Sequence, residues 1–359
     1  MATPVEERKQ PADRAVARRP AHEFDAIVLV SFGGPEGLDD VMPFLENVTR
    51  GRNVPRERLL DVAHHYELFD GVSPLNAQNR ALIAALEPEL RQRRVDLPVY
   101  LGNRNWHPYL ADTMRQMTDD GVGRALAVFT SAFSSYSGCR QYREDLYNAQ
   151  QTAGPDAPEV PRARMFFNHP GFVEANVDRV RAAMSELGRD DVHIAFTAHS
   201  IPSAMAANCA YEAQLAETAR LVAEAVGVAD WAVAFQSRSG SPHVPWLEPD
   251  IGDHLREVHE RGVQAVVISP IGFVSDHLEV LFDLDVEARQ IADELGLSMA
   301  RAGTAGTHPA FVAGLADLIV ERMTPDAERP ALGRFGPSHD VCAPDCCLPG
   351  TGRPSPWDA

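Results

Sequence analysis

The chain has 359 residues, a hydrophobic fraction of 45% and a formal net charge of −18. That length suits two domains, and that hydrophobic fraction is enough to build buried cores, which excludes a globally disordered chain. The negative charge argues against nucleic acid and anionic membrane surfaces as partners, because both carry charge of the same sign.

The first 24 residues are charged and show no periodicity, so residues 1–24 are expected to form a disordered arm. They lack the apolar stretch of a signal peptide. No apolar run in the chain reaches the roughly 18–20 residues that a membrane span requires. We therefore expect a cytoplasmic protein without stable membrane insertion.

The first half of the chain alternates short apolar runs with helical patterns. Residues 25–31 form a continuous apolar run that ends before Gly33-Gly34-Pro35, as a buried parallel strand ends in a turn. Further strands are predicted at 97–101 and 125–129, and helices at 38–48 and 76–95. Residues 150–163 contain a glycine and three prolines, which indicates a connection.

The same pattern then starts again. Strands are predicted at 192–196, 231–235 and 265–269, and helices at 211–226, 251–261 and 308–323. Strands that alternate with helices predict βαβ units and parallel sheets. Because turns and aromatic residues follow the strands in a similar order in both halves, we expect two similar α/β domains facing across a cleft. A chance similarity of the two halves is the alternative.

His199 follows a predicted parallel strand, at the sheet edge where open α/β sheets bind ligands. A purely structural histidine is the alternative. A stripe of carboxylates has the spacing of one helix face and comprises Asp276, Glu279, Asp283 and Glu287. Such a row is suited to passing on a divalent cation or accepting protons, and its apolar neighbours predict burial. A solvated acidic face is the alternative reading.

Five cysteines occur in the chain, and three of them, Cys342, Cys346 and Cys347, fall within six residues near the C-terminus. In a reducing compartment this clustering favours a metal or cluster site over a disulfide framework.

Six segments together resemble the ferrochelatase family, in the order in which the family has them. They are LVSFGGPE (29–36), TRGR (49–52), GVSPL (71–75), TAHSIP (197–202), FQSRSG (235–240) and GFVSDHLEVLFDLDVE (272–287). The resemblance implies an α/β fold with two Rossmann-like, chelatase-type domains whose four-stranded parallel sheets face each other across a porphyrin cleft. Domain I would comprise 25–170 and be completed by a C-terminal helix at 304–325, domain II would comprise 171–303, and 326–359 would form a cysteine-containing tail.

The family inserts ferrous iron into a porphyrin and releases two protons, so the resemblance implies the same reaction here. It makes His199 the catalytic histidine and Glu279 the acid opposite it, with Asp283 and Glu287 completing a metal-binding row. Whether His199 accepts a proton or binds iron first stays open. The substrate-binding residues carried over from the family are Phe32, Arg52, Ser73 and Tyr142.

The resemblance also implies a [2Fe–2S] cluster. Cys139 matches a remote ligand of iron–sulfur members, and Cys342, Cys346 and Cys347 resemble their C-terminal group. Four thiolates hold such a cluster, which leaves Cys209 as a free thiol. Zinc is the alternative occupant.

The composition and the SYSGC…CAPDCC combination are similar to actinobacterial members, which act on coproporphyrin III in haem b synthesis. Protoporphyrin IX is the alternative substrate. A tetrapyrrole or metal carrier without turnover and a cobalt or nickel chelatase are the other readings. The expected partners are the porphyrin, Fe²⁺ and the neighbouring enzymes of the haem pathway.

Overall fold

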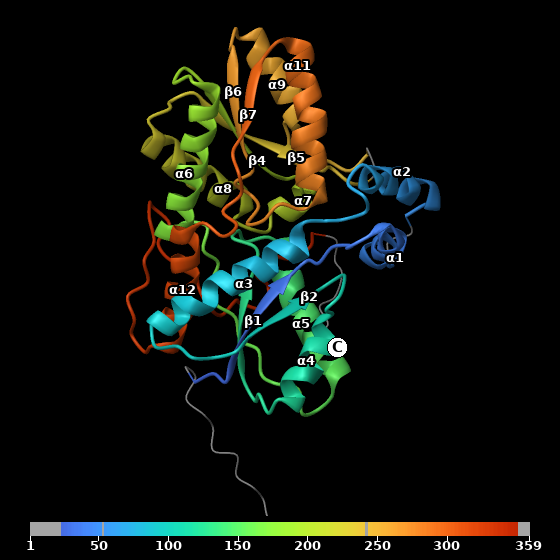
Figure 1. Cartoon of the computed structure of the whole chain (residues 1–359), viewed down its shortest axis with the longest axis vertical. Helices are drawn as coiled ribbons and strands as arrows, with labels where there is room; N and C mark the ends of the chain where they lie inside the picture. Colours follow the sequence, from blue (N-terminus) through green and yellow to red (C-terminus); the bar gives the residue numbers. More distant parts are fainter. Residues whose placement is uncertain (1–22, 52–53, 241–242, 351–359) are drawn as a thin grey trace, which may run out of the picture.

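The computed structural model describes residues 23–51, 54–240 and 243–350. Within them, two parallel β-sheets lie one above the other along the long axis of the molecule (Figure 1). The expected N-terminal arm lies almost wholly outside the described residues, as does the end of the tail. Among the described residues, no helix combines the length and the apolar character that crossing a membrane requires.

The first sheet has the strand order β2-β1-β3. Its strands are β1 (Ala26–Ser31), β2 (Val99–Asn103) and β3 (Ala125–Phe129). Helices α3 (Leu75–Gln92), α4 (Leu110–Asp119), α5 (Gln141–Ala153) and α12 (Pro309–Met323) cover it. Alternate residues of the apolar run in β1 serve opposite faces: Leu29 packs with residues of α3 and α12, and Val28 with residues of α4 and α5.

The fourth strand expected in this sheet is not a regular strand among the described residues. Residues 159–163 lie parallel to β3, but only through isolated bridges at Glu159 and Arg162. Pro161 accepts a hydrogen bond from Ala127, yet it has no N–H to return one. The prolines therefore interrupt the ladder and explain why the first sheet has three regular strands instead of four.

The second sheet has four strands in the order β5-β4-β6-β7, as expected. They are β4 (His193–His199), β5 (Trp231–Gln236), β6 (Ala265–Ser269) and β7 (Ser298–Arg301). Helices α6 (Pro170–Leu187) and α8 (Tyr211–Val226) pack on one face. On the other face lie α9 (Ile251–Glu260), the π-helix η2 (Leu281–Ala288) and α11 (Arg289–Leu295).

Both sheets place their first strand in the centre, the second strand on one side and the third on the other. This shared order supports the internal repeat that the sequence suggested. The α/β class and the two parallel-sheet domains are thus confirmed. One core cluster contains both Leu29 of β1 and Phe196 of β4, so the two sheets share a continuous apolar core.

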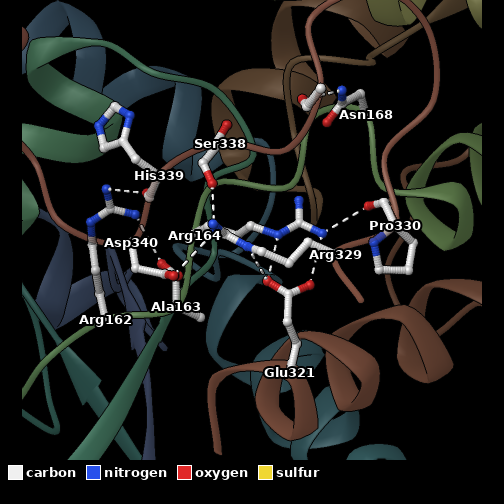
Figure 2. A network of polar contacts seen from close by, with 11 residues as sticks. Arg162, Ala163, Arg164, Asn168, Glu321, Arg329, Pro330, Ser338, His339 and Asp340 are labelled. Carbon is white, nitrogen blue, oxygen red and sulfur yellow. Dashed lines mark hydrogen bonds and ion pairs between the residues drawn. The ribbon is translucent and has the colours of Figure 1, made fainter. Parts of the chain in front are cut away.

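Two further parts of the fold bear on the site. Helices α1 (Leu38–Val48) and α2 (Arg56–Glu67) project together at one side of the molecule (Figure 1). The last helix, α12, packs against α3 and α6, and Glu321 near its end binds both Arg164 and Arg329 (Figure 2). These ion pairs tie the tail that follows α12 to the body of the protein.

Candidate active site

His199 is the last residue of β4, at the carboxyl edge of the second sheet. Its Nδ1 lies 2.5 Å from the carbonyl oxygen of Ser200. Because a carbonyl oxygen only accepts hydrogen bonds, Nδ1 carries a proton, and in the neutral imidazole the lone pair is then on Nε2. Nε2 lies 3.7 Å from Oε2 of Glu279. His199 therefore presents a base or a metal-binding nitrogen toward a carboxylate.

Glu279, Asp283 and Glu287 form one row of carboxylates. The row starts on the short helix α10 (Leu278–Val280) and continues along η2. On an α-helix each step of four residues drifts by about 40°, whereas the i→i+5 bonding of a π-helix widens the turn and reduces this drift. The three carboxylates follow one another along α10 and η2, and the row leads away from His199.

Asp276 does not belong to this row, although the sequence pattern included it. It precedes the helix, and its Oδ1 lies 3.0 Å from Nη1 of Arg301. Its backbone N–H donates to Gln78. The predicted stripe was thus too long by its first member, because the helix begins only at Leu278.

The expected burial of the row is correct only for its middle. The side chain of Glu279 is 49% exposed, and Glu287 is also exposed, whereas Asp283 is partly buried. The apolar neighbours Val280 and Leu284 are fully buried in the core of the second domain. They turn the opposite side of the helix outward, so the ends of the carboxylate row are accessible.

Two residues at the end of β5 bind the carboxylate of Asp283. Ser237 Oγ donates a short hydrogen bond to Asp283 Oδ2, and Gln236 Nε2 donates to the same oxygen over 3.3 Å. Ser237 has a φ of 58°, a left-handed conformation that is uncommon for a residue other than glycine. Burial, followed by the charges of Glu279 and Glu287, raises the pKa of Asp283 to about 7 against the opposing hydrogen bond from Ser237.

Gln236 and Ser237 lie in the segment FQSRSG that resembles the family, but no role was predicted for either residue. A signal was present, because polar residues after neighbouring parallel strands meet at one edge of a sheet. In the structure Gln236 of β5 is the register partner of His199. Its Oε1 is buried and has no hydrogen-bond partner within the described residues.

Helix α2 of the projecting pair reaches the carboxylate row. The ring of His65 stacks on Phe282 with centroids 3.8 Å apart and an interplanar angle of 9°. Burial, and after it the charge of Glu279, raises the pKa of the neighbouring Tyr66. The site is therefore formed by residues of both halves of the chain.

The four residues predicted to bind substrate differ in accessibility. Phe32 is exposed beside Phe44. Tyr142 is buried against the guanidinium of Arg104, which lies 4.4 Å from its ring centre, and Ser73 is also buried. Arg52 lies outside the described residues. Substrate contacts at these four positions stay predictions.

The four cysteines predicted to bind a cluster lie together. Cys139, in the π-helix η1 (Tyr136–Arg140), belongs to a core cluster against which Cys342 packs, and the sulfurs of Cys342 and Cys346 lie within 4.8 Å of each other. Cys346 Sγ is 3.5 Å from Cys347 Sγ. Cys209 instead faces backbone carbonyls of its own helical turn, 3.4 Å from that of Met205. All five thiols are free.

Comparison with protein families gives a match to the ferrochelatase model over residues 24–323, most of the chain. The chain belongs to the ferrochelatase family. It is therefore an enzyme that inserts a metal ion into a porphyrin, as the sequence motifs implied.

Curated relatives agree with this assignment. A ferrochelatase from Rhodopirellula baltica is 58% identical over 92% of this chain and 95% of its own length. A coproporphyrin III ferrochelatase from Streptomyces coelicolor is 51% identical over 93% and 96%, and one from Nocardia farcinica is 52% identical over 90% and 97%.

A solved structure of SirB from Bacillus subtilis with Fe³⁺ resembles this ferrochelatase in fold. The TM-score is 0.52 with 12% sequence identity, and the match covers 83% of this chain and 95% of SirB. At that identity the likeness concerns the fold alone, which is of the chelatase type.

Proposed function

We propose that this ferrochelatase inserts Fe²⁺ into coproporphyrin III, forms iron coproporphyrin III for haem b synthesis and releases two protons. The observation that carries the proposal is the position of His199 Nε2, which faces Glu279 across 3.7 Å at the head of a carboxylate row. The coproporphyrin III ferrochelatases of S. coelicolor and N. farcinica support this choice of substrate, because they match over at least nine-tenths of either chain.

In the proposed reaction the carboxylates of Glu287, Asp283 and Glu279 pass Fe²⁺ toward the porphyrin, since carboxylate oxygens suit a divalent iron ion. His199 Nε2 accepts a proton from a pyrrole N–H. The carboxylate of Glu279, 3.7 Å away, then stabilises the imidazolium that forms. The second pyrrole proton leaves through the carboxylate row, and the two freed nitrogens bind the iron.

The test is anaerobic incubation of the purified enzyme with Fe²⁺ and either coproporphyrin III or protoporphyrin IX, followed by absorbance. We expect metal insertion to be faster with coproporphyrin III. A preference for protoporphyrin IX would overturn the substrate while leaving the enzyme class intact. Porphyrin binding without insertion of any metal would instead favour the carrier reading.

We also propose that Cys139, Cys342, Cys346 and Cys347 hold a [2Fe–2S] cluster. The donor set fits, because four thiols lie in a chain of contacts and basic groups surround them. Arg162 Nη2 lies 2.9 Å from Cys342 Sγ, and Arg140 Nη1 donates to the carbonyl of Cys346 over 3.0 Å. When bound, the cluster would supply four iron–thiolate bonds that cross-link the tail to η1.

Thiolate ligands of this kind persist in a reducing compartment, so the cytoplasm is the proposed location. The enzymes that deliver coproporphyrin III and take up its iron complex are the proposed partners.

A further inference from the structure

Three potential metal ligands of the tail lie close together. Nε2 of His339 and the sulfurs of Cys342 and Cys346 all lie within 4.8 Å of one another. The separation between His339 Nε2 and Cys346 Sγ is 4.0 Å. Ligands of a tetrahedral zinc ion, with bonds of about 2.0–2.3 Å, lie roughly 3.3–3.8 Å apart. A contraction of about 1 Å therefore completes such a site.

Two arginines, Arg162 and Arg329, hold the backbone around His339 (Figure 2). Arg162 Nη2 binds both the carbonyl of His339, over 3.2 Å, and the sulfur of Cys342. Arg329 Nη2 donates to the carbonyl of Ser338 over 2.7 Å and to Asp340 over 3.1 Å. Residues 338–340 are thus clamped from both sides.

The clamp is itself anchored in the folded body. Glu321, which is nearly buried, accepts hydrogen bonds from Arg329 and from both Nε and Nη2 of Arg164. In Figure 2 the imidazole of His339 points away from this ion-pair network. Its ring is therefore free of the arginines that hold its backbone, and it is exposed. The geometry supplies a fixed backbone with an accessible donor, as a metal site requires.

We propose that His339, Cys342 and Cys346, with Cys139 as the fourth donor, bind a single tetrahedral metal ion of the zinc type when no iron–sulfur cluster is present. The spacing His339-x2-Cys342-x3-Cys346 is within the range of short zinc-binding motifs. Cys139 completes the set because Cys342 packs against the core cluster to which the buried Cys139 belongs. The proposal does not depend on the porphyrin substrate.

The charges suit this ligand set. Three thiolates, a neutral imidazole and a divalent cation leave one net negative charge, and Arg162 lies in contact with Cys342 Sγ. The mononuclear site and the proposed cluster share three thiols and differ in one ligand, His339 against Cys347.

The test uses Co²⁺ as the probe, because its thiolate charge-transfer and d–d bands report tetrahedral sulfur ligation. A His199→Ala background removes the imidazole beside the carboxylate row, and any Co²⁺ that the remaining carboxylates bind gives no thiolate bands. The protein is freed of iron with a chelator under reducing conditions and titrated with Co²⁺, and Zn²⁺ competition then gives the affinity. The variants are His339→Ala and Cys347→Ser.

We expect Co²⁺ to give tetrahedral bands in the parent, and His339→Ala to weaken binding at least roughly tenfold and shift the d–d bands. Cys347→Ser should bind within twofold of the parent. If Cys347→Ser loses the bands while His339→Ala keeps them, the site is all-thiolate and the proposal is wrong. Absence of thiolate bands in the parent would also overturn it. Because His339 is exposed, circular dichroism should show its variant folded.

Discussion

His199 Nε2 and Glu279 Oε2 lie 3.7 Å apart at the carboxyl edge of the second sheet. The histidine ends β4, the glutamate stands on α10, and both elements belong to the same domain. Their relative position is therefore set by one folded unit. Movement of the first domain against the second would leave this pair intact while changing the space above it.

The order of the carboxylates predicts unequal effects of removing their charge. Glu279→Gln should lower the rate of metal insertion by orders of magnitude, because Glu279 faces His199. Glu287→Gln should cost less, because it lies two steps farther along the row. Initial rates at saturating porphyrin measure the effects of both substitutions. Glu294→Gln, at an exposed position of α11, is the control. A larger loss at Glu287 would mean that the row runs in the opposite direction.

Asp283 should make the unfolding free energy depend on pH. Its pKa in the folded protein is raised to about 7, mainly by burial, from an ordinary value of 3.8. The folded state therefore holds this proton more tightly, and the group costs stability increasingly as pH rises from 3.8 to about 7. The unfolding free energy of Asp283→Asn minus that of the wild type should therefore be more positive at pH 8 than at pH 5. Urea unfolding curves that differ by the same amount at both pH values would contradict this.

A second titrating pair lies at the opposite end of β4. Nε2 of His193 and Nε2 of His254 are 2.9 Å apart and buried, with Asp230, Glu257 and Arg261 nearby. Burial lowers the pKa of both imidazoles below 6.5, despite the charge of Asp230 beside His193. Because the unfolded state binds these protons more tightly, the contribution of the pair to the unfolding free energy is complete above pH 6.5. It decreases as the pH falls below 6.5.

The unfolding free energy of the wild type should thus fall more steeply between pH 6.5 and pH 5 than that of His254→Asn. Protonation of the pair would set two donors against each other in the core. Chemical denaturation at several pH values measures the two slopes. Parallel curves would show that the pair does not control acid stability.

The proposed ligands of the [2Fe–2S] cluster predict which cysteine substitutions remove the absorbance of the cluster. Serine at Cys139 or Cys347 should abolish the absorbance and acid-labile sulfide of a [2Fe–2S] cluster. Cys209→Ser is the matched control, because Cys209 Sγ is hydrogen-bonded to a neighbouring carbonyl instead of to another thiol. Zinc without sulfide in the purified wild type would reject the cluster. Bleaching by Cys209→Ser but not by Cys347→Ser would reject only the ligand set.

Much of the fold could be predicted from apolar periodicity. The strand at 125–129 and the helix at 211–226 coincide with β3 and α8. Helix α2 was not predicted, because its pattern is dominated by charged residues and histidines. The fourth strand of the first sheet was expected from the family and is reduced to bridges, because Pro161 lacks an N–H.

The candidate site was predictable where one strand or one helix sets it. The carboxylate row follows from spacing along η2, whereas the contact between His199 and Glu279 depends on tertiary packing and came from the family resemblance. Gln236 and Ser237 could not be assigned to Asp283, because a left-handed turn at Ser237 directs the hydroxyl there. His339 was missed although it stands only three residues before Cys342, because the family resemblance pointed to the cysteines alone.

The central claim is that His199, opposite Glu279, carries metal insertion, and His199→Ala tests it most directly. The measurement is the anaerobic initial rate of Fe²⁺ insertion into coproporphyrin III. His64→Ala, at an exposed position of α2, is the matched histidine control. The account predicts that His199→Ala lowers the rate by about 10²–10⁴-fold, as expected for loss of a proton acceptor. It predicts an unchanged far-ultraviolet spectrum and a control variant as active as wild type. A rate for His199→Ala within twofold of wild type would contradict it.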